Sequence, residues 1–254
     1  MAKFTTILTE SPNAIRVNGG YFPLPLVRRG PTAFGNIVSA DYGINPINGE
    51  KLICAPFEWN AELASYAFRQ RDNLALSSVI NAINGSGKVL TGNSIFVTTP
   101  TKVYFVQFPA NDLVKQFGVN DQKVLDKTVA EFKERLKGCK EKYGVVWGDG
   151  IRMISTKGVP SGDIDKNDFK PFPGLVGIVG SMKTAQGIAR AGREDYSLSP
   201  YFSLNIDQTN LATRVPVLGS VGFVSGLYVG GGYAGCSDRC SFGGSVSGAA
   251  TRAK

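Results

Sequence analysis

Two cysteines near the C-terminus form the pair whose spacing best permits covalent chemistry. Cys236 and Cys240 stand four positions apart, and an arginine precedes the second of them. A neighbouring guanidinium favours the thiolate, which is the reactive form of cysteine. We predict unmodified thiols and no cofactor, and we keep this pair as the candidate site for a prosthetic group attached through a thioether. Cys54 and Cys139 are isolated in the sequence, which argues against a four-cysteine zinc site.

The sequence contains no histidine, and this absence narrows the catalytic alternatives. Histidine is the usual general base near neutral pH and the commonest metal ligand. Without it, a Ser-His-Asp or Cys-His nucleophile and a histidine-based metal site are excluded. A carboxylate- or lysine-dependent enzyme remains the catalytic alternative, with Asp149, Arg152 and Glu141 as the residues close enough in sequence to form a cluster. We predict that the protein is not an enzyme and has no catalytic residues.

Two loops resemble ligand-binding motifs and depart from them at defining positions. Residues 85–88, Gly-Ser-Gly-Lys, lack the first glycine and the final hydroxyl residue of a phosphate-binding loop. Residues 163–168 space their carboxylates as a calcium loop does, but the glycine and the last glutamate of that loop are missing. We expect a helix-ending turn at the first loop, a solvated acidic turn at the second, and no metal site.

The excess of positive charge is the main indication of a partner. Lysine and arginine outnumber aspartate and glutamate by 28 to 20, which gives a net charge of +8. Such a balance favours acidic partners. The basic residues are scattered and do not alternate with aromatic residues as on a nucleic-acid-binding platform. We therefore expect protein subunits with acidic surfaces, with nucleic acid as the alternative; the candidate partner-binding residues are Arg28, Arg29, Arg190, Arg193 and Arg214.

The central part of the chain, residues 58–156, has the clearest periodicity. It predicts a first helix that Asn60 caps and that reaches the turn at residues 85–88, then two strands at 94–99 and 102–108. A second helix follows Asn120 or Asp121, and two more strands follow at 145–147 and 151–155. The second helix carries its apolar residues at helical spacing: Leu125, Val129, Phe132 and Leu136. The fold class is therefore α+β, with a helix plus β-β-α-β unit as the core domain.

The flanking segments differ in character from this core. Residues 1–57 are rich in proline and glycine, which predicts an extended N-terminal arm. Residues 157–254 form a glycine-rich region of β or irregular structure, which ends in a basic tail that begins at Phe242. Its apolar runs at 175–182, 215–224 and 227–229 are broken by glycine, which is typical of short strands where backbones approach closely.

These features favour an assembly protein. An extended arm usually becomes ordered on a partner. We expect a non-catalytic structural or assembly protein of a large multi-subunit complex, with a virus or phage particle preferred. The alternatives are a basic linker that joins acidic subunits, such as light-harvesting antenna proteins, with a pigment on a cysteine, and the carboxylate- or lysine-dependent enzyme named above.

The chain lacks a run of about 20 apolar residues and a long enough apolar N-terminal run for a signal peptide. We therefore expect no membrane span. We also expect a protein that is not secreted and that lies in the cytoplasm or in a particle assembled inside the cell.

Overall fold

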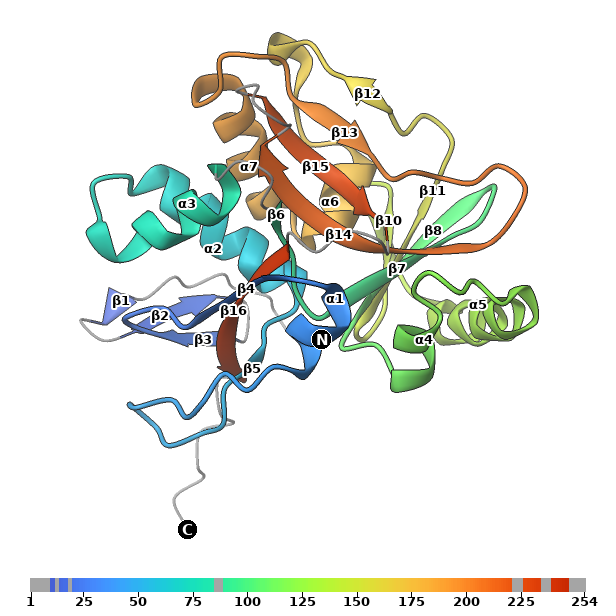
Figure 1. Cartoon of the computed structure of the whole chain (residues 1–254). Coiled ribbons are helices and arrows are strands. Elements are labelled where there is room, and N and C mark those ends of the chain that lie inside the picture. Colours follow the sequence, from blue (N-terminus) through green and yellow to red (C-terminus); the bar gives the residue numbers. More distant parts are fainter. Residues whose placement is uncertain are drawn as a thin grey trace.

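The computed structural model describes residues 10–11, 14–17, 20–84, 89–220, 226–233 and 239–246, and these residues adopt an α+β fold (Figure 1). The helices are α1 (Phe34–Ser39), α2 (Phe57–Arg69), α3 (Ser77–Asn84), α4 (Asn111–Lys115), α5 (Gln122–Leu136), α6 (Pro173–Val179) and α7 (Met182–Glu194), with 3-10 turns at η1 (Leu74–Leu76) and η2 (Lys166–Asp168). None of the helices in the described part of the chain combines the length and hydrophobicity needed to cross a membrane.

The strands form one sheet, whose main path of hydrogen-bonded neighbours runs in the order β1-β2-β3-β16-β6-β14-β7-β8-β11-β10-β9, and strands β4, β5, β12, β13 and β15 pair at its sides. Their bounds in chain order are β1 (Glu10–Ser11), β2 (Ala14–Val17), β3 (Gly20–Pro23), β4 (Arg28–Thr32), β5 (Ile53–Cys54), β6 (Val89–Leu90), β7 (Ser94–Thr98), β8 (Lys102–Gln107), β9 (Glu141–Lys142), β10 (Val145–Trp147), β11 (Ile151–Ser155), β12 (Gly162–Asp163), β13 (Tyr201–Ser203), β14 (Ala212–Ser220), β15 (Leu227–Gly232) and β16 (Arg239–Val246).

Strand β14 connects the two halves of this sheet. Its first residues, 212–214, pair with β7, whereas residues 215–220 pair with β15. Residues of β14 also bond to β6, which continues the path to β16 and the N-terminal strands. The two halves of the molecule therefore share a strand.

The antiparallel part, β7-β8-β11-β10, is covered by helices on both faces (Figure 1). Because side chains alternate along a strand, Phe96 and Phe105 belong to the core that contains α2, α6 and α7. Their neighbours Ile95 and Tyr104 belong to the core that contains α5. The four apolar residues predicted for the second helix are all buried in that core, and its N-cap is Asp121, one of the two predicted residues.

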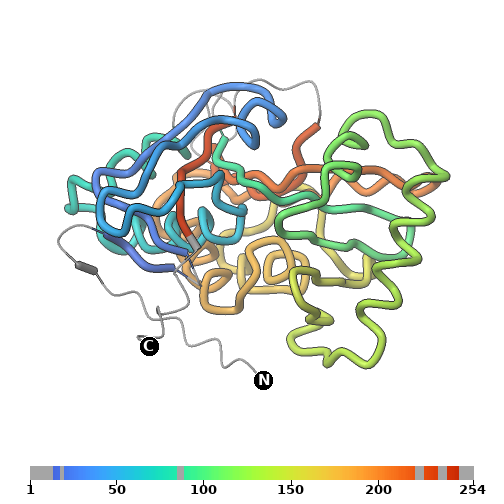
Figure 2. The backbone as a smooth tube through the Cα atoms, turned by 90° about the horizontal axis from the view of Figure 1, so that it is seen from below, coloured from blue at the N-terminus to red at the C-terminus, as the bar shows by residue number. Residues whose placement is uncertain are grey.

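The described part of the predicted N-terminal arm belongs to the sheet. Strands β3, β4 and β5 all pair with β16, and Ile15 and Phe22 are fully buried in the main core. Figure 2 shows these N-terminal residues, in blue, beside the red C-terminal strand. The tail predicted from Phe242 is wrong as far as residue 246, because Phe242 is buried in β16; residues 247–254 lie outside the described residues.

The prediction for the first helix was right in kind and wrong in its bounds. The helix α2 begins at Phe57, after Pro56, and ends at Arg69, while α3 is a separate helix. Asn60 does not cap α2: its buried side chain donates to Thr91 O at 2.6 Å and Ser241 Oγ at 2.9 Å. Sequence patterns could not reveal these partners because they are distant in the sequence, just after β6 and in β16.

The glycine-rich region contains both strands and an unpredicted helix. Strands β14 and β15 confirm two of the predicted strands in their described residues. The run at 175–182 was predicted as a strand. This is wrong, since residues 173–179 form the helix α6. Pro173 occupies its first turn, and Gly180 ends it with a left-handed φ of 77°. Proline at the start and glycine just past the end are the usual helix signals.

A buried ion pair joins α2 to the sheet. Glu58 and Arg152 are 3% and 4% exposed, and Arg152 Nη2 bonds Glu58 Oε1. Ser94 Oγ donates to the other carboxylate oxygen at 2.7 Å, and Arg152 Nε donates to Gly177 O at 3.0 Å. The pair thus connects α2, β7, β11 and α6. Buried charges are tolerated only with such partners.

We predict that Glu58→Ala lowers the free energy of unfolding by about 3–5 kcal/mol, because it leaves the Arg152 guanidinium buried without its counter-charge. Ser94→Ala, which removes one hydrogen bond to the carboxylate, should cost only about 1–3 kcal/mol. The double variant Glu58→Met, Arg152→Leu should recover most of the lost stability, because neither charge remains. Urea unfolding of the three variants measures these differences, and equal losses in all three would contradict this role of the pair.

Candidate functional site

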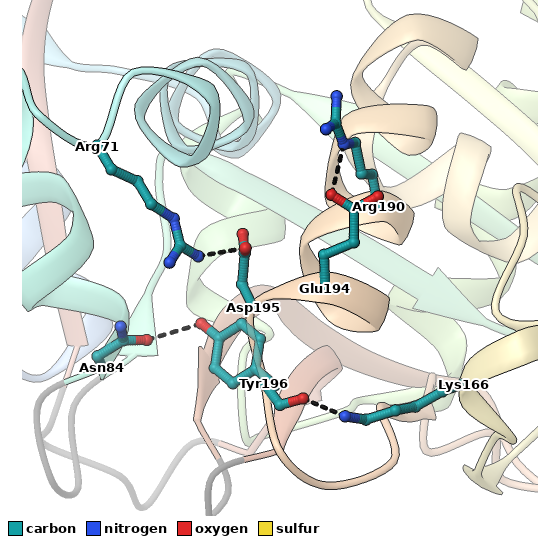
Figure 3. A network of polar contacts seen from close by, with 7 residues as sticks. All are labelled: Arg71, Asn84, Lys166, Arg190, Glu194, Asp195 and Tyr196. Atoms are coloured by element: carbon teal, nitrogen blue, oxygen red, sulfur yellow. Dashed lines mark hydrogen bonds and ion pairs between the residues drawn. The ribbon is translucent and has the colours of Figure 1, made fainter.

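The C-terminal ends of α2 and α7 meet beside α3 at two adjoining cavities. The larger one, which we call the arginine cleft, has a volume of about 480 Å³ and is lined by Phe68, Arg69, Arg71, Gly187, Arg190, Ala191, Glu194 and Asp195. The smaller one, which we call the amide pocket, has a volume of about 210 Å³ and is lined by Phe68, Arg71, Ser77, Ile80, Asn81, Asn84, Asp195 and Tyr196. Figure 3 shows several of these side chains.

The two helices that line the arginine cleft, α2 and α7, approach each other closely. Gly187 lies over Ser65, so closely that a Cβ at residue 187 would overlap Ser65 Oγ. Ser65 Oγ in turn accepts a hydrogen bond from Arg69 Nη1 at 3.3 Å. The glycine therefore sets how Arg69, at the end of α2, lies relative to Arg190 on α7.

Two ion pairs hold the remaining charges of the cleft (Figure 3). Arg71 Nη2 lies 2.5 Å from Asp195 Oδ1, and Arg190 Nε lies 2.7 Å from Glu194 Oε2. Both arginine side chains stay more than half exposed, at 52% and 62%. The Arg190–Glu194 pair, which is exposed on both sides, contributes little to stability, whereas the Asp195 side chain is only 17% exposed. A guanidinium has five N–H donors, so each arginine keeps donors that no described residue occupies.

Tyr196 forms the base of the amide pocket (Figure 3). Its ring packs edge-on against Phe68 with 6.1 Å between centroids, and its hydroxyl donates to Asn84 Oδ1 at 2.7 Å. Lys166 Nζ donates to its backbone oxygen. Burial, and secondarily the Asp195 carboxylate, raises the pKa of the Tyr196 phenol, against a smaller lowering by Arg71. The phenol is therefore a neutral donor that fixes Asn84.

The structure places only one of the predicted partner-binding arginines, Arg190, in the cleft. On the same helix, Arg193 Nη1 donates to Phe169 O. Arg28 and Arg29 lie on β4, and Arg214 on β14 covers the ring of Tyr233 at 4.7 Å. These four stay predictions as partner-binding residues.

Sequence reasoning missed the other two arginines of the cleft. Arg69 and Arg71 stand two positions apart where α2 ends. Basic residues are favoured at a helix C-terminus, so this pair was a usable signal once the end of the helix was known.

The cysteine pair is described only in part. Cys240 is fully buried in β16, within the main core, and Cys236 lies outside the described residues. Burial raises the pKa of the Cys54 thiol, which donates to Ser241 Oγ at 3.4 Å. Attachment of a prosthetic group to Cys236 or Cys240 therefore stays a prediction.

The other motif-like residues do not form a site in the described part of the chain. Asp149 and Glu141 are exposed, whereas Arg152 is buried with Glu58, so the carboxylate cluster considered for an enzyme is not formed. Asp165 accepts a hydrogen bond from Asn167 N at 2.8 Å, as in an ordinary acidic turn. Among the described residues, no group of histidine, cysteine, aspartate or glutamate could hold a metal ion. The loop at 85–88 lies outside them.

Comparisons with known proteins give no family for this chain. No protein-family model matches the sequence, and no curated protein is detectably similar to it. A solved structure described as "Accommodation of massive sequence variation in Nanoarchaeota by the C-type lectin fold" is similar with a TM-score of 0.42 and 14% identity, over 75% of this chain and 84% of that one. A likeness of that strength carries no argument about a ligand, a partner or an activity.

We predict that Gly187→Ala lowers the free energy of unfolding by about 1–3 kcal/mol, because the new methyl group has no space beside Ser65. Alanine would otherwise favour the helix by about 1 kcal/mol. Gly35→Ala is the matched control: it also lies in a helix, but its Cβ would meet open space, so it should stabilise. Urea unfolding of the two variants should give changes of opposite sign; a stabilising Gly187→Ala would show that the helices separate freely.

We predict that stability falls as the pH rises above about 10, the pKa of an unperturbed tyrosine. Burial raises the pKa of Tyr42, as it does that of Tyr196. Above pH 10 the unfolded state therefore loses protons that the folded state keeps, and stability declines with pH. Tyrosinate absorbance measures the ionisation of the tyrosines, and urea unfolding at the same pH values measures the decline in stability. Tyr42→Phe should flatten the decline; a decline that is unchanged in that variant would contradict the assignment.

Proposed function

We propose that the chain is a non-catalytic assembly protein of a larger multi-subunit complex, and that its arginine cleft docks acidic segments of partner proteins. The observation that carries the proposal is the convergence of Arg69, Arg71 and Arg190, from α2 and α7, on one cleft of about 480 Å³. Within the cleft these three positive charges face two carboxylates, those of Glu194 and Asp195. The cleft is thus net positive when empty of a partner.

The chemistry of guanidinium supports a carboxylate as the docked group. A guanidinium matches a carboxylate with two parallel hydrogen bonds, and such charge-assisted bonds are stronger than neutral ones. A partner carboxylate can exchange with Glu194 at small cost, because both side chains of the Arg190–Glu194 pair are exposed. The net charge of +8 would also speed encounter with an acidic partner.

Three observations support a non-catalytic role inside the cell. The buried charges of Glu58 and Arg152 are used to join elements of the fold. The phenol of Tyr196, in the adjoining amide pocket, is kept neutral by burial. The thiols of Cys54 and Cys139 form no disulfide with a described residue, which suits a reducing compartment.

A virus or phage particle, in which many copies share interfaces, is the setting that we propose. We prefer it to an antenna linker that carries a pigment. Cys240 is fully buried in the main core, so a pigment would have to be carried by another cysteine.

Native mass spectrometry of the untagged protein from its source tests the assembly role. We predict that the chain appears within a large complex and gives 27.1 kDa on denaturation, with any added mass assigned to attached groups. A chain found only as a 27.1 kDa monomer would overturn the proposal.

The same complex tests the docking site. The double variant Arg69→Gln, Arg190→Gln should rebind the recovered partner subunits at least about tenfold more weakly, because it removes charge-assisted contacts. The control Lys123→Gln, Lys127→Gln removes the same charge from the exposed face of α5 and should have little effect. Equal weakening by both pairs would mean that the charge acts diffusely and that the cleft is not the docking site.

A further inference from the structure

The arginine cleft and the amide pocket adjoin each other. They share Phe68, Arg71 and Asp195, so a ligand in one lies against the walls of the other. Their linings differ: the cleft presents mainly charges, whereas the pocket presents apolar surface and side-chain amides. A partner segment that fills both must therefore carry two different groups a short distance apart.

The amide pocket has the groups that bind a peptide. Asn81 and Asn84 lie three residues apart on α3, and hence on the same side of the helix, and both are exposed. Asn84 uses its Oδ1 atom to accept from Tyr196, and no described residue takes its Nδ2 group. Phe68 and Ile80 provide apolar surface beside these amides.

The molecule itself contains an example of a side-chain amide that binds backbone groups. Gln122 Nε2 donates to Leu211 O at 2.8 Å, and Gln122 Oε1 accepts from Leu211 N at 3.0 Å. Both backbone groups of one residue are thus satisfied by one side chain. A side-chain amide of the amide pocket can bind the backbone of a partner in the same way.

We infer that the site binds an extended peptide in which an acidic residue stands two positions from an apolar one. The carboxylate binds Arg69 and Arg190, the apolar side chain enters the amide pocket against Phe68 and Ile80, and Asn81 and Asn84 bind the intervening backbone. Residues two positions apart point to the same side of an extended chain, about 6–7 Å from each other, which suits two adjoining cavities. This inference rests on the proposed docking function and names its partner motif.

The test uses three fluorescein-labelled peptides and fluorescence anisotropy. The full peptide is Gly-Ser-Phe-Ser-Glu-Ser-Phe-Ser-Gly, which places an apolar residue two positions from the acid on either side. In the acid-only peptide both phenylalanines are alanine, and in the apolar-only peptide the glutamate is glutamine. We expect the full peptide to bind at least about tenfold more tightly than either of the others, because it gains both the buried ring and the charged contact.

Two variants separate the inference from the proposed function. Asn81→Trp fills the amide pocket and removes one amide that contacts the peptide backbone. It should therefore remove the tenfold advantage of the full peptide, while the acid-only peptide loses no more than that one hydrogen bond. Arg69→Gln with Arg190→Gln should weaken both acidic peptides about tenfold or more. Urea unfolding of each variant confirms that the fold is retained.

Each outcome decides between the two claims. If the full and acid-only peptides bind equally, or if Asn81→Trp weakens both equally, the motif is wrong and the acidic docking role survives. If no acidic peptide binds, both the peptide motif and the acidic docking role are wrong. A single-stranded oligonucleotide is the last probe. If it binds more tightly than the full peptide, and if its binding is lost in the arginine variant but retained in Asn81→Trp, the partner carries phosphate and the peptide inference is wrong.

Discussion

Glu58 and Arg152 are two opposite charges removed from water where α2, α6 and the sheet meet. Each charge alone would destabilise the core, so the carboxylate and the guanidinium must arrive together with their hydrogen-bonding partners, Ser94 and the backbone of Gly177. This requirement fixes the start of α2 against β7 and β11. Because a helix is stiff, fixing its start also directs its far end, where Arg69 and the arginine cleft lie.

The other wall of the arginine cleft is α7, and its position depends on a close contact between uncharged residues. The absence of a side chain at Gly187 lets α7 approach Ser65, and that approach decides the separation of the arginines on the two helices. The carboxylates of Glu194 and Asp195 stand at the C-terminal end of α7, where the helix dipole disfavours them. Arg190 and Arg71 compensate for this. The cleft thus holds acidic groups of its own where we propose that a partner's carboxylate docks.

The sequence predicted the elements whose evidence is local. Helix α5 has an N-cap at Asp121 and apolar residues at regular spacing, and both can be recognised without any tertiary contact. Helix α6 is buried on all sides, so it shows no amphipathic period, and only Pro173 and Gly180 indicate it. The cleft could not be predicted, because Arg69 and Arg190 come together only through the contact of Gly187 with Ser65. The α+β class survived these errors because the helix α5 and the strands around it, β7, β8, β10 and β11, were recognised.

The pairing of β3, β4 and β5 with β16 has a consequence for how the chain is made. Strands β3, β4 and β5 are synthesised long before their common partner, residues 239–246. Closure of so long a loop is slow, and unpaired strand edges are prone to aggregate until it occurs. This part of the sheet therefore forms only after β16 has been made, which makes it a late step in folding.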